Sequence, residues 1–206
     1  MKTNYVSKLL HGTLATGLGQ VSVIALGMVG LMISTRILPT EELGLFLLLQ
    51  VVAIFLAEFT SFGLNLTVPQ FLARAGADDD TWRLINTVVI LRLVIIVVAS
   101  VLTLFISDQL FNAFGSSSVY EPIVIYLPLL FGLEGMTKLT SSILQGIFEF
   151  RKIALMGALN SLINLVVLVI LVGLMGWGIY GLIVAKVLSR GVTLLWVVVT
   201  TDHDLG

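Results

Sequence analysis

Six ionisable residues stand inside long apolar stretches of this chain, and their chemistry bounds what the chain can bind. They are four bases and two acids: Arg92, Lys138, Lys186, Arg190, Glu58 and Glu134. An ionisable side chain at the centre of a bilayer costs about 2.5–3.5 kcal/mol on insertion scales, so such residues usually face a bundle interior or a water-filled cavity. We therefore expect these six side chains to line a common wet interior.

The spacing of the charges separates those that can neutralise each other from those that cannot. Glu134 and Lys138 are four residues apart, which places them on one face of a helix, where they can pair. Lys186 and Arg190 have the same spacing, but two cations cannot pair with each other. They need a carboxylate from elsewhere or an anionic ligand, so they are the sharper candidates for a binding site.

The six charges sum to +2, although the whole chain has a formal net charge of −1. A positive interior suits an anionic group such as a phosphate or pyrophosphate headgroup, which arginine binds bidentately and lysine as a point charge. The alternative is that these residues form structural ion pairs, with some side chains snorkelling to an interface. That alternative applies most to Arg92 and Glu58, which lie nearer the cytoplasmic ends of their stretches.

Polar and helix-loosening residues accompany the charges. Asn160 and Asn164 repeat the four-residue spacing and can either line the same cavity or hydrogen-bond to a neighbouring helix. Two prolines and two glycines are expected to loosen the helix that carries Glu134: Pro122, Pro128, Gly132 and Gly135. Broken helices are tolerated in membranes where neighbours or cavity water satisfy the backbone, and in transporters they often mark the moving part.

The composition is that of an integral membrane protein. Hydrophobic residues make up 58% and charged residues 11% of the 206 residues, against about 45–50% and 25% in soluble domains. The chain has no cysteine, which excludes disulfides, thiolate nucleophiles and cysteine metal sites. His11 and His203 stand at opposite ends, so we expect no histidine metal site and no cofactor. Nothing in the charge pattern indicates a nucleic-acid partner.

Six stretches are long enough to cross the hydrocarbon core, which takes about 20 apolar residues in a helix. They cover roughly residues 14–35, 43–64, 84–107, 121–144, 153–175 and 178–200. The first resembles a signal peptide, but it is long enough to span and no small-residue cleavage site follows it. The predicted fold is an all-α, polytopic membrane protein with six transmembrane helices in a single unit, residues 1–206.

Basic residues in the short connections predict a cytoplasmic N-terminus. That orientation places six basic residues inside: Lys2, Lys8, Arg74, Arg83, Arg151 and Lys152. Only Arg36 then lies outside, and six spans return the C-terminus to the cytoplasm. Trp82 and Trp196 would lie near the inner interface and Trp177 near the outer one, where indole rings are enriched.

Two connections have local chemistry of their own. In "RILPTEELG", Pro39 is expected to end the first helix, and Thr40 to cap the second, with Glu41 and Glu42 in its first turn. The aspartates at 78–80 are expected to form a solvated loop rather than a divalent-metal site, because adjacent residues diverge in direction and no histidine is near. Asp80 is a candidate cap for the following helix.

Three segments together resemble one family. They are "RILPTEELGLFLLLQ", "FTSFGLNLTVPQFLAR" and "LQGIFEFRKIALMGALNSLINLVV", and the resemblance runs over nearly the whole chain. It is to the Wzx-type polysaccharide and O-antigen flippases of the MOP superfamily, which also contains the MATE drug exporters. The resemblance implies transport of undecaprenyl-pyrophosphate-linked oligosaccharide across the bacterial cytoplasmic (inner) membrane, for surface polysaccharide biosynthesis. It does not imply particular substrate residues.

The chain departs from that family pattern in length. The family has two six-helix lobes around a central cavity, and this chain resembles the N-terminal lobe alone. A fragment or truncated frame is the favoured explanation, and a homodimer of two copies is the alternative. We expect a second lobe, in one form or the other, to be needed for transport.

Three other functions compete with the flippase hypothesis. A MATE-type cation-coupled exporter would use Glu58 or Glu134 for coupling, but basic residues outnumber acidic ones in the predicted cavity. An intramembrane enzyme would need a metal-binding acidic pair or a His/Arg phosphatase set, and the spans carry neither, so we expect no enzyme. A non-catalytic membrane subunit is the remaining alternative.

Overall fold

The structure is a computed structural model that describes residues 2–75, 79–114 and 125–203, with side chains over residues 19–74, 82–105 and 125–200. These ranges are almost entirely helical, as predicted. In chain order the helices are α1 (Lys2–Ile37), α2 (Thr40–Phe59), α3 (Leu64–Ala75), α4 (Asp79–Phe114), α6 (Leu127–Gly146), α7 (Phe150–Leu168), the π-helical segment η1 (Val169–Leu174) and α8 (Gly178–His203).

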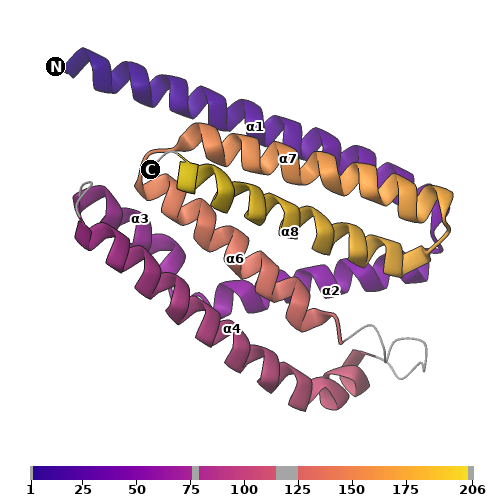
Figure 1. Ribbon diagram of the computed structural model, residues 1–206. Coiled ribbons are helices and arrows are strands. Elements are labelled where there is room, and N and C mark those ends of the chain that lie inside the picture. The colour runs from indigo at the N-terminus through magenta and orange to yellow at the C-terminus, as the bar shows by residue number, and fades with distance from the viewer. Residues whose placement is uncertain (1, 76–78, 115–124, 204–206) are drawn as a thin grey trace.

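Helix α6 is the centre of the bundle. It packs against α2, α3, α4 and α8, whereas α1 lies along α7, and α7 along α8 (Figure 1). The start of α1 and the end of α8 lie at the same end of the bundle, which we call the terminal end (Figure 1). Which side of a membrane this end faces stays a prediction from the basic residues.

Within the described residues, five helical segments are long and apolar enough to cross a membrane: Gly19–Ile37, Thr40–Phe59, Trp82–Phe105, Phe150–Leu174 and Gly178–Thr200. They correspond to five of the six predicted spans. The remaining one is α6, which has 20 residues but carries Glu134 and Lys138 and is less apolar. It begins at Leu127 and not at residue 121, and that it also crosses a membrane stays a prediction.

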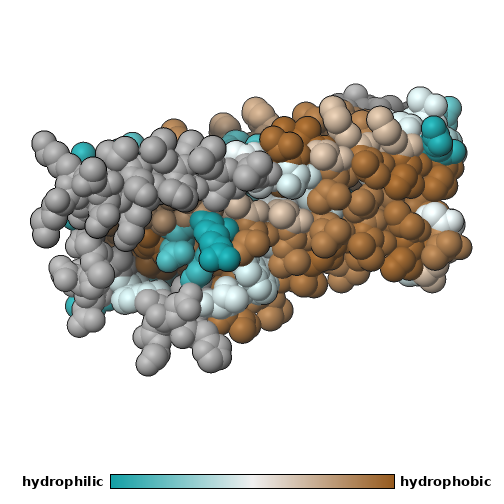
Figure 2. All heavy atoms as spheres, turned by 90° about the horizontal axis from the view of Figure 1, so that it is seen from above, coloured by the Kyte–Doolittle hydropathy of each residue, from teal (hydrophilic) through white to brown (hydrophobic). Residues whose placement is uncertain are grey.

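The surface of the bundle is that of a protein in lipid. Figure 2 shows a broad hydrophobic area, with hydrophilic residues gathered towards the terminal end and at the opposite tip. Large apolar side chains stay exposed along the outside of several helices, including Met32, Phe55, Leu102 and Leu195. Their exposure is expected where lipid tails, rather than water, surround the helices.

The second predicted span ends early, and a helix that the sequence did not indicate follows it. Helix α2 stops at Phe59 and α3 starts at Leu64, so the expected span over 43–64 is wrong in its last turn. Between them Phe62 and Gly63 have positive φ angles of 45° and 78°. Such angles are strained for a bulky residue and free for glycine, so the pair turns the chain out of the helix.

The expected cap of α2 is also wrong. Pro39 stands at the N-cap position, Thr40 is already the first helical residue, and no side chain caps this helix. Glu41 and Glu42 do lie in its first turn, as predicted. However, Glu42 serves a different helix, because its Oε2 accepts a hydrogen bond from the Ile179 backbone N–H at 3.0 Å. It thereby caps the start of α8 with a negative charge.

Pro128, Gly132 and Gly135 do not loosen α6, contrary to the prediction. Pro128 stands in the first turn, where its missing N–H costs nothing, and Pro122 lies outside the described residues. Gly132 and Gly135 are buried contact points: a Cβ at Gly132 would lie 3.2 Å from Ile96, and one at Gly135 2.5 Å from the Arg92 guanidinium. Their role is close approach of α4 to α6.

Small residues also join α1 to α7. A Cβ built on Gly19 would lie 2.8 Å from Ala154 Cβ and 2.9 Å from its Cα, and one on Gly157 would lie 3.1 Å from Val23. Membrane helices associate where small residues let their backbones approach, because lipid supplies no hydrophobic driving force between helices. The α1–α7 contact is of this kind.

A pair of glycine substitutions on α1 tests this contact. Gly19→Ala should lower the thermal unfolding midpoint, because the new methyl group meets the backbone of α7. Gly27→Ala is the matched control: nothing lies within 4 Å of its Cβ, and alanine favours a helix by about 1 kcal/mol over glycine. Scanning fluorimetry in lipid nanodiscs measures both midpoints. Equal midpoints for the two variants would contradict the proposed packing.

Candidate functional site

The six intramembrane charges form two groups, each of which joins α6 to a different neighbouring helix. Glu134 on α6 faces α8, and Lys138, one turn later on α6, faces α2. The predicted pairing of Glu134 with Lys138 is therefore wrong. Each uses its charge to bind a different neighbouring helix, because α8 presents Arg190 to Glu134 and α2 presents Glu58 to Lys138.

The first group, the α8 group, consists of Glu134, Arg190 and Lys186. Arg190 forms an ion pair with Glu134, and their side chains are only 8% and 13% exposed. Arg190 Nη1 also donates a long hydrogen bond of 3.5 Å to the Leu130 carbonyl. Of the two partners expected for Arg190, a carboxylate from elsewhere or an anionic ligand, the structure supplies the carboxylate.

Lys186 remains the unpaired cation of the α8 group. It lies one turn before Arg190, close enough for its charge to interact with those of both Arg190 and Glu134. Among the residues that the structure describes, its ammonium has neither a hydrogen-bond nor an ion-pair partner. The one carboxylate of the group is taken by Arg190, so Lys186 has spare binding capacity.

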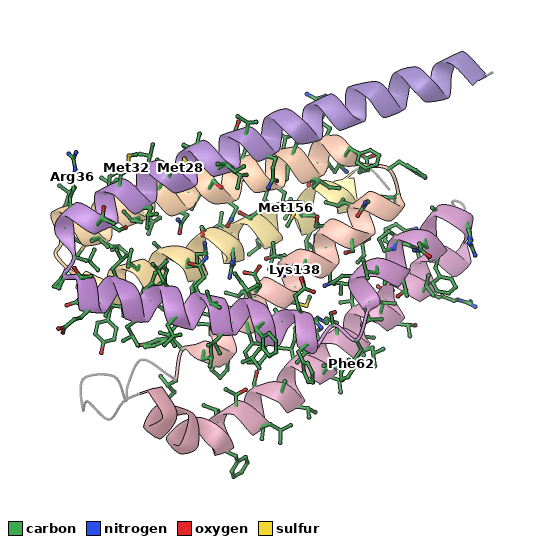
Figure 3. All side chains as sticks on the ribbon, turned by 180° about the vertical axis from the view of Figure 1, so that it is seen from behind. Met28, Met32, Arg36, Phe62, Lys138 and Met156 are labelled. Carbon is green, nitrogen blue, oxygen red and sulfur yellow. The ribbon has the colours of Figure 1, made fainter. Side chains whose placement is uncertain are left out.

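The second group, the α2 group, consists of Glu58, Lys138 and Arg92. Lys138 forms an ion pair with Glu58, with exposed side-chain fractions of 27% and 53%. The other carboxylate oxygen of Glu58, Oε2, accepts a hydrogen bond of 3.4 Å from Asn65 Nδ2. This group is more open than the α8 group, and Figure 3 shows Lys138 near the middle of the bundle.

Arg92 is the buried member of the α2 group. Its side chain is 0% exposed, and its Nη2 donates a hydrogen bond of 2.7 Å to the Ala57 carbonyl. Among the residues that the structure describes, its Nε and Nη1 have no hydrogen-bond partner. The alternative that Arg92 snorkels to an interface is therefore wrong, because a fully buried guanidinium has not reached one.

The turn after α2 supplies polar residues that the sequence analysis did not select. Besides its bond to Glu58, Asn65 accepts a hydrogen bond at its backbone carbonyl from Ser142 Oγ of α6, at 3.0 Å. The α2–α3 turn is thus tied to α6 beside the Glu58–Lys138 pair. The clustering of Thr60, Ser61 and Asn65 within an apolar region was the available sign.

Asn160 and Asn164 do not join either group. Both lie on α7, which packs mainly on α1 and α8. In the described part of the chain, no hydrogen bond or ion pair links them to the six charges. Asn160 Oδ1 is buried without a partner, so its role stays open.

The aspartate segment at 78–80 gives no support for a metal site. Residue 78 lies outside the described residues, as do the side chains of Asp79 and Asp80. Helix α4 starts at Asp79, so Asp80 stands inside the first turn and is not the N-cap. Within the described ranges, no group of three histidine, cysteine or acidic residues is placed to hold a metal ion.

Solved structures of MATE and MOP-superfamily transporters have the same arrangement of helices. The chain aligns with MATE in complex with MaD5 at a TM-score of 0.75 and 21% identity, over 92% of this chain and 44% of that one. A mutant MATE gives 0.74 and 22% over the same shares. A MOP-superfamily transporter from Pyrococcus furiosus gives 0.71 and 20%, over 92% and 43%.

The chain thus spans less than half the length of these structures, and the fold is that of one of their lobes. In the Pyrococcus furiosus transporter, a binding pocket of reverse polarity suggests a different function for that protein. No well-characterised protein matches the chain significantly by sequence.

The profile of a sequence family described as "Polysaccharide biosynthesis protein" matches residues 9–202, nearly the whole chain. This match and the helical arrangement agree with the resemblance drawn from the sequence motifs. The chain belongs to the polysaccharide biosynthesis protein family and is a multi-pass membrane protein with the fold of one MOP-superfamily lobe.

Proposed function

We propose that the chain is one lobe of a flippase that carries a lipid-linked oligosaccharide across the bacterial cytoplasmic membrane. The ligand would be an undecaprenyl-pyrophosphate-linked glycan for surface polysaccharide such as O-antigen, and its pyrophosphate would bind the cations beside α6. The family description and the excess of intramembrane cations support this proposal.

The observation that carries the proposal is the unequal pairing within each group. The α8 group has one carboxylate for two cations, and so has the α2 group. A buried cation without a counterion is unfavourable, so each group gains from an anion that enters it. A pyrophosphate headgroup supplies several negative oxygens that can bind a lysine ammonium.

Transport would need a second lobe, because one lobe supplies only one wall of a central site. The second lobe can be a further part of a longer protein or another copy of this chain. Alternating access would follow from rocking of the two lobes, so that the site opens first to the cytoplasm and then to the other side.

A MATE-type exporter of cationic compounds is the second candidate, and the likeness to solved MATE structures favours it. Its coupling carboxylates would be Glu58 or Glu134, but both are already paired with cations. The two candidates differ in ligand charge. We expect the purified chain in nanodiscs to bind inorganic pyrophosphate and not ethidium, measured by titration calorimetry and dye fluorescence. Binding of ethidium alone would favour the exporter.

Removal of the unpaired cation tests the anion site. Lys186→Gln should weaken pyrophosphate binding by about 10- to 100-fold, the loss expected for one hydrogen bond to a charged group of 1.5–3 kcal/mol. Arg36→Gln removes one positive charge from the exposed last turn of α1, so it controls for net charge. An equal loss in both variants would show that binding is non-specific.

A charge exchange tests whether Glu134 holds Arg190 in place. Glu134→Gln leaves a buried guanidinium uncompensated, and breaking a buried pair in this way costs about 3–5 kcal/mol. The thermal midpoint should fall accordingly. The double variant Glu134→Arg with Arg190→Glu should recover most of it, since the pair is reversed and not removed. A double variant no more stable than its parents would refute the pairing.

A further inference from the structure

Arg92 is fully buried, but it has fewer hydrogen-bond partners than a buried guanidinium normally needs. Within the described part of the chain it makes one hydrogen bond, to the Ala57 carbonyl, while its Nε and Nη1 have no partner. Buried arginines are normally paired with a carboxylate, because removing a charge from water is expensive without a counterion. The nitrogen atoms of Arg92 therefore have unused capacity for one.

The carboxylate whose charge interacts with that of Arg92 belongs to Glu58. Ala57, whose carbonyl binds Arg92, is the residue directly before Glu58, and the charges of Arg92 and Glu58 interact. Glu58 is occupied by Lys138 and Asn65. Lys138 on α6 and Arg92 on α4 thus compete for the Glu58 carboxylate. Lys138, the more exposed of the two, is the one paired with it.

The backbone next to Glu58 is suited to a change of partner. Helix α2 ends one residue later, and the chain then turns through the positive φ angles of Phe62 and Gly63. Figure 3 shows Phe62 at this turn, on the far side from α1. Helix ends and turns are where backbone changes are most easily absorbed, so the last turn of α2 can shift without moving the rest of the span.

We propose that Arg92 is a positioning residue that takes over Glu58 when Lys138 leaves it for an anionic ligand. In the present state Lys138 is paired with Glu58, and Arg92 is not. In the second state Lys138 contacts the anion, and Glu58 pairs with the unpartnered edge of Arg92. The exchange keeps every carboxylate neutralised in both states, and it shifts the end of α2 from α6 towards α4.

The two cations are suited to different roles. Lys138 is 27% exposed and flexible, so it can reach a ligand, whereas Arg92 is 0% exposed and fixed to the Ala57 carbonyl. Gly135 leaves the space for the guanidinium, because a Cβ there would lie 2.5 Å from Arg92 Nη2. Arg92 therefore acts through Glu58 and does not touch the ligand itself. The identity of the ligand rests on the proposed function, but the exchange of partners does not.

A pair of double-mutant cycles tests the exchange without any ligand. The first compares Glu58→Gln, Arg92→Gln and their combination in the native chain, by scanning fluorimetry in nanodiscs. The second repeats the cycle in the Lys138→Gln background. We expect little coupling in the first cycle. In the second, Glu58→Gln should lower the midpoint by about 3 °C more when Arg92 is present than in the Arg92→Gln variant.

The second cycle distinguishes the alternatives. Coupling that is equal with and without Lys138, or absent in both, would refute the exchange and leave Arg92 with a packing role only. If the Arg92→Gln variants fail to fold, Gly135→Ala displaces the guanidinium more mildly and should remove the coupling in the same way. Gly191→Ala, on a site with nothing within 4 Å, is its control.

Titration of inorganic pyrophosphate then tests the link to the ligand. Arg92→Gln should weaken binding about tenfold when Glu58 is present, because Glu58 then keeps Lys138. In the Glu58→Gln background, Arg92→Gln should have no effect on pyrophosphate binding. A residue that touches the anion directly, or one that only supports the fold, would weaken binding in both backgrounds. Absence of binding by the native chain would refute the proposed function, while the unfolding cycles still decide the exchange.

Discussion

The fold depends on one electrostatic constraint, which is that a charge enclosed between membrane helices must be balanced by another helix. Water and salt do not screen it there, and the unpaired charge is far more expensive than in solution. Helix α6 meets this constraint twice, because it offers a carboxylate to α8 and an ammonium one turn later to α2. A helix that carries two charges can therefore stand at the centre of the bundle.

This arrangement combines cohesion with unsatisfied binding capacity. Each ion pair joins α6 to a neighbour, but each group contains one cation more than its carboxylate can balance. A bundle stabilised only by apolar packing would have no positive charge to attract an anion. A bundle in which every cation is paired with a carboxylate would have no cation left to bind one. The surplus of one positive charge in the α8 group and in the α2 group is thus consistent with both a stable lobe and an anionic ligand.

The sequence predicted the helices well because each is a long apolar run with polar residues at its ends. It did not predict α3, whose 12 residues include Pro69 and are too short for a span. It also missed where α6 begins, since the apolar run includes Ile125 and Tyr126, which precede the helix. Small residues were visible in the sequence, but only the packing shows that Gly135 accommodates Arg92 and not a bend. Family membership was predictable from three connecting segments and is confirmed by the profile match.

The candidate site was predictable in its residue types and not in its pairing. Four-residue spacing places Glu134 and Lys138 on one face, but side chains at successive turns can diverge towards different neighbours. Which neighbours those are depends on the three-dimensional packing of α2 and α8, which no spacing encodes. The same reason explains Glu42, whose position in the first turn of α2 was correct while its partner on α8 came from 137 residues further along the chain.

The hydrogen bond between Glu42 and Ile179 fixes the start of α8 against α2. At the end of the bundle away from both termini, Glu42 holds the first turn of α8, and Tyr126 and Tyr180 meet edge to face with ring centres 6.4 Å apart. Helix α8 is therefore fixed at its start, and a tilt about this point displaces its later turns the most. Arg190 lies about 17 Å along it from Ile179, so a tilt of about 10° about this point moves its backbone by about 3 Å. A small rotation of one helix is enough to open or close the ion pair at the middle of the bundle.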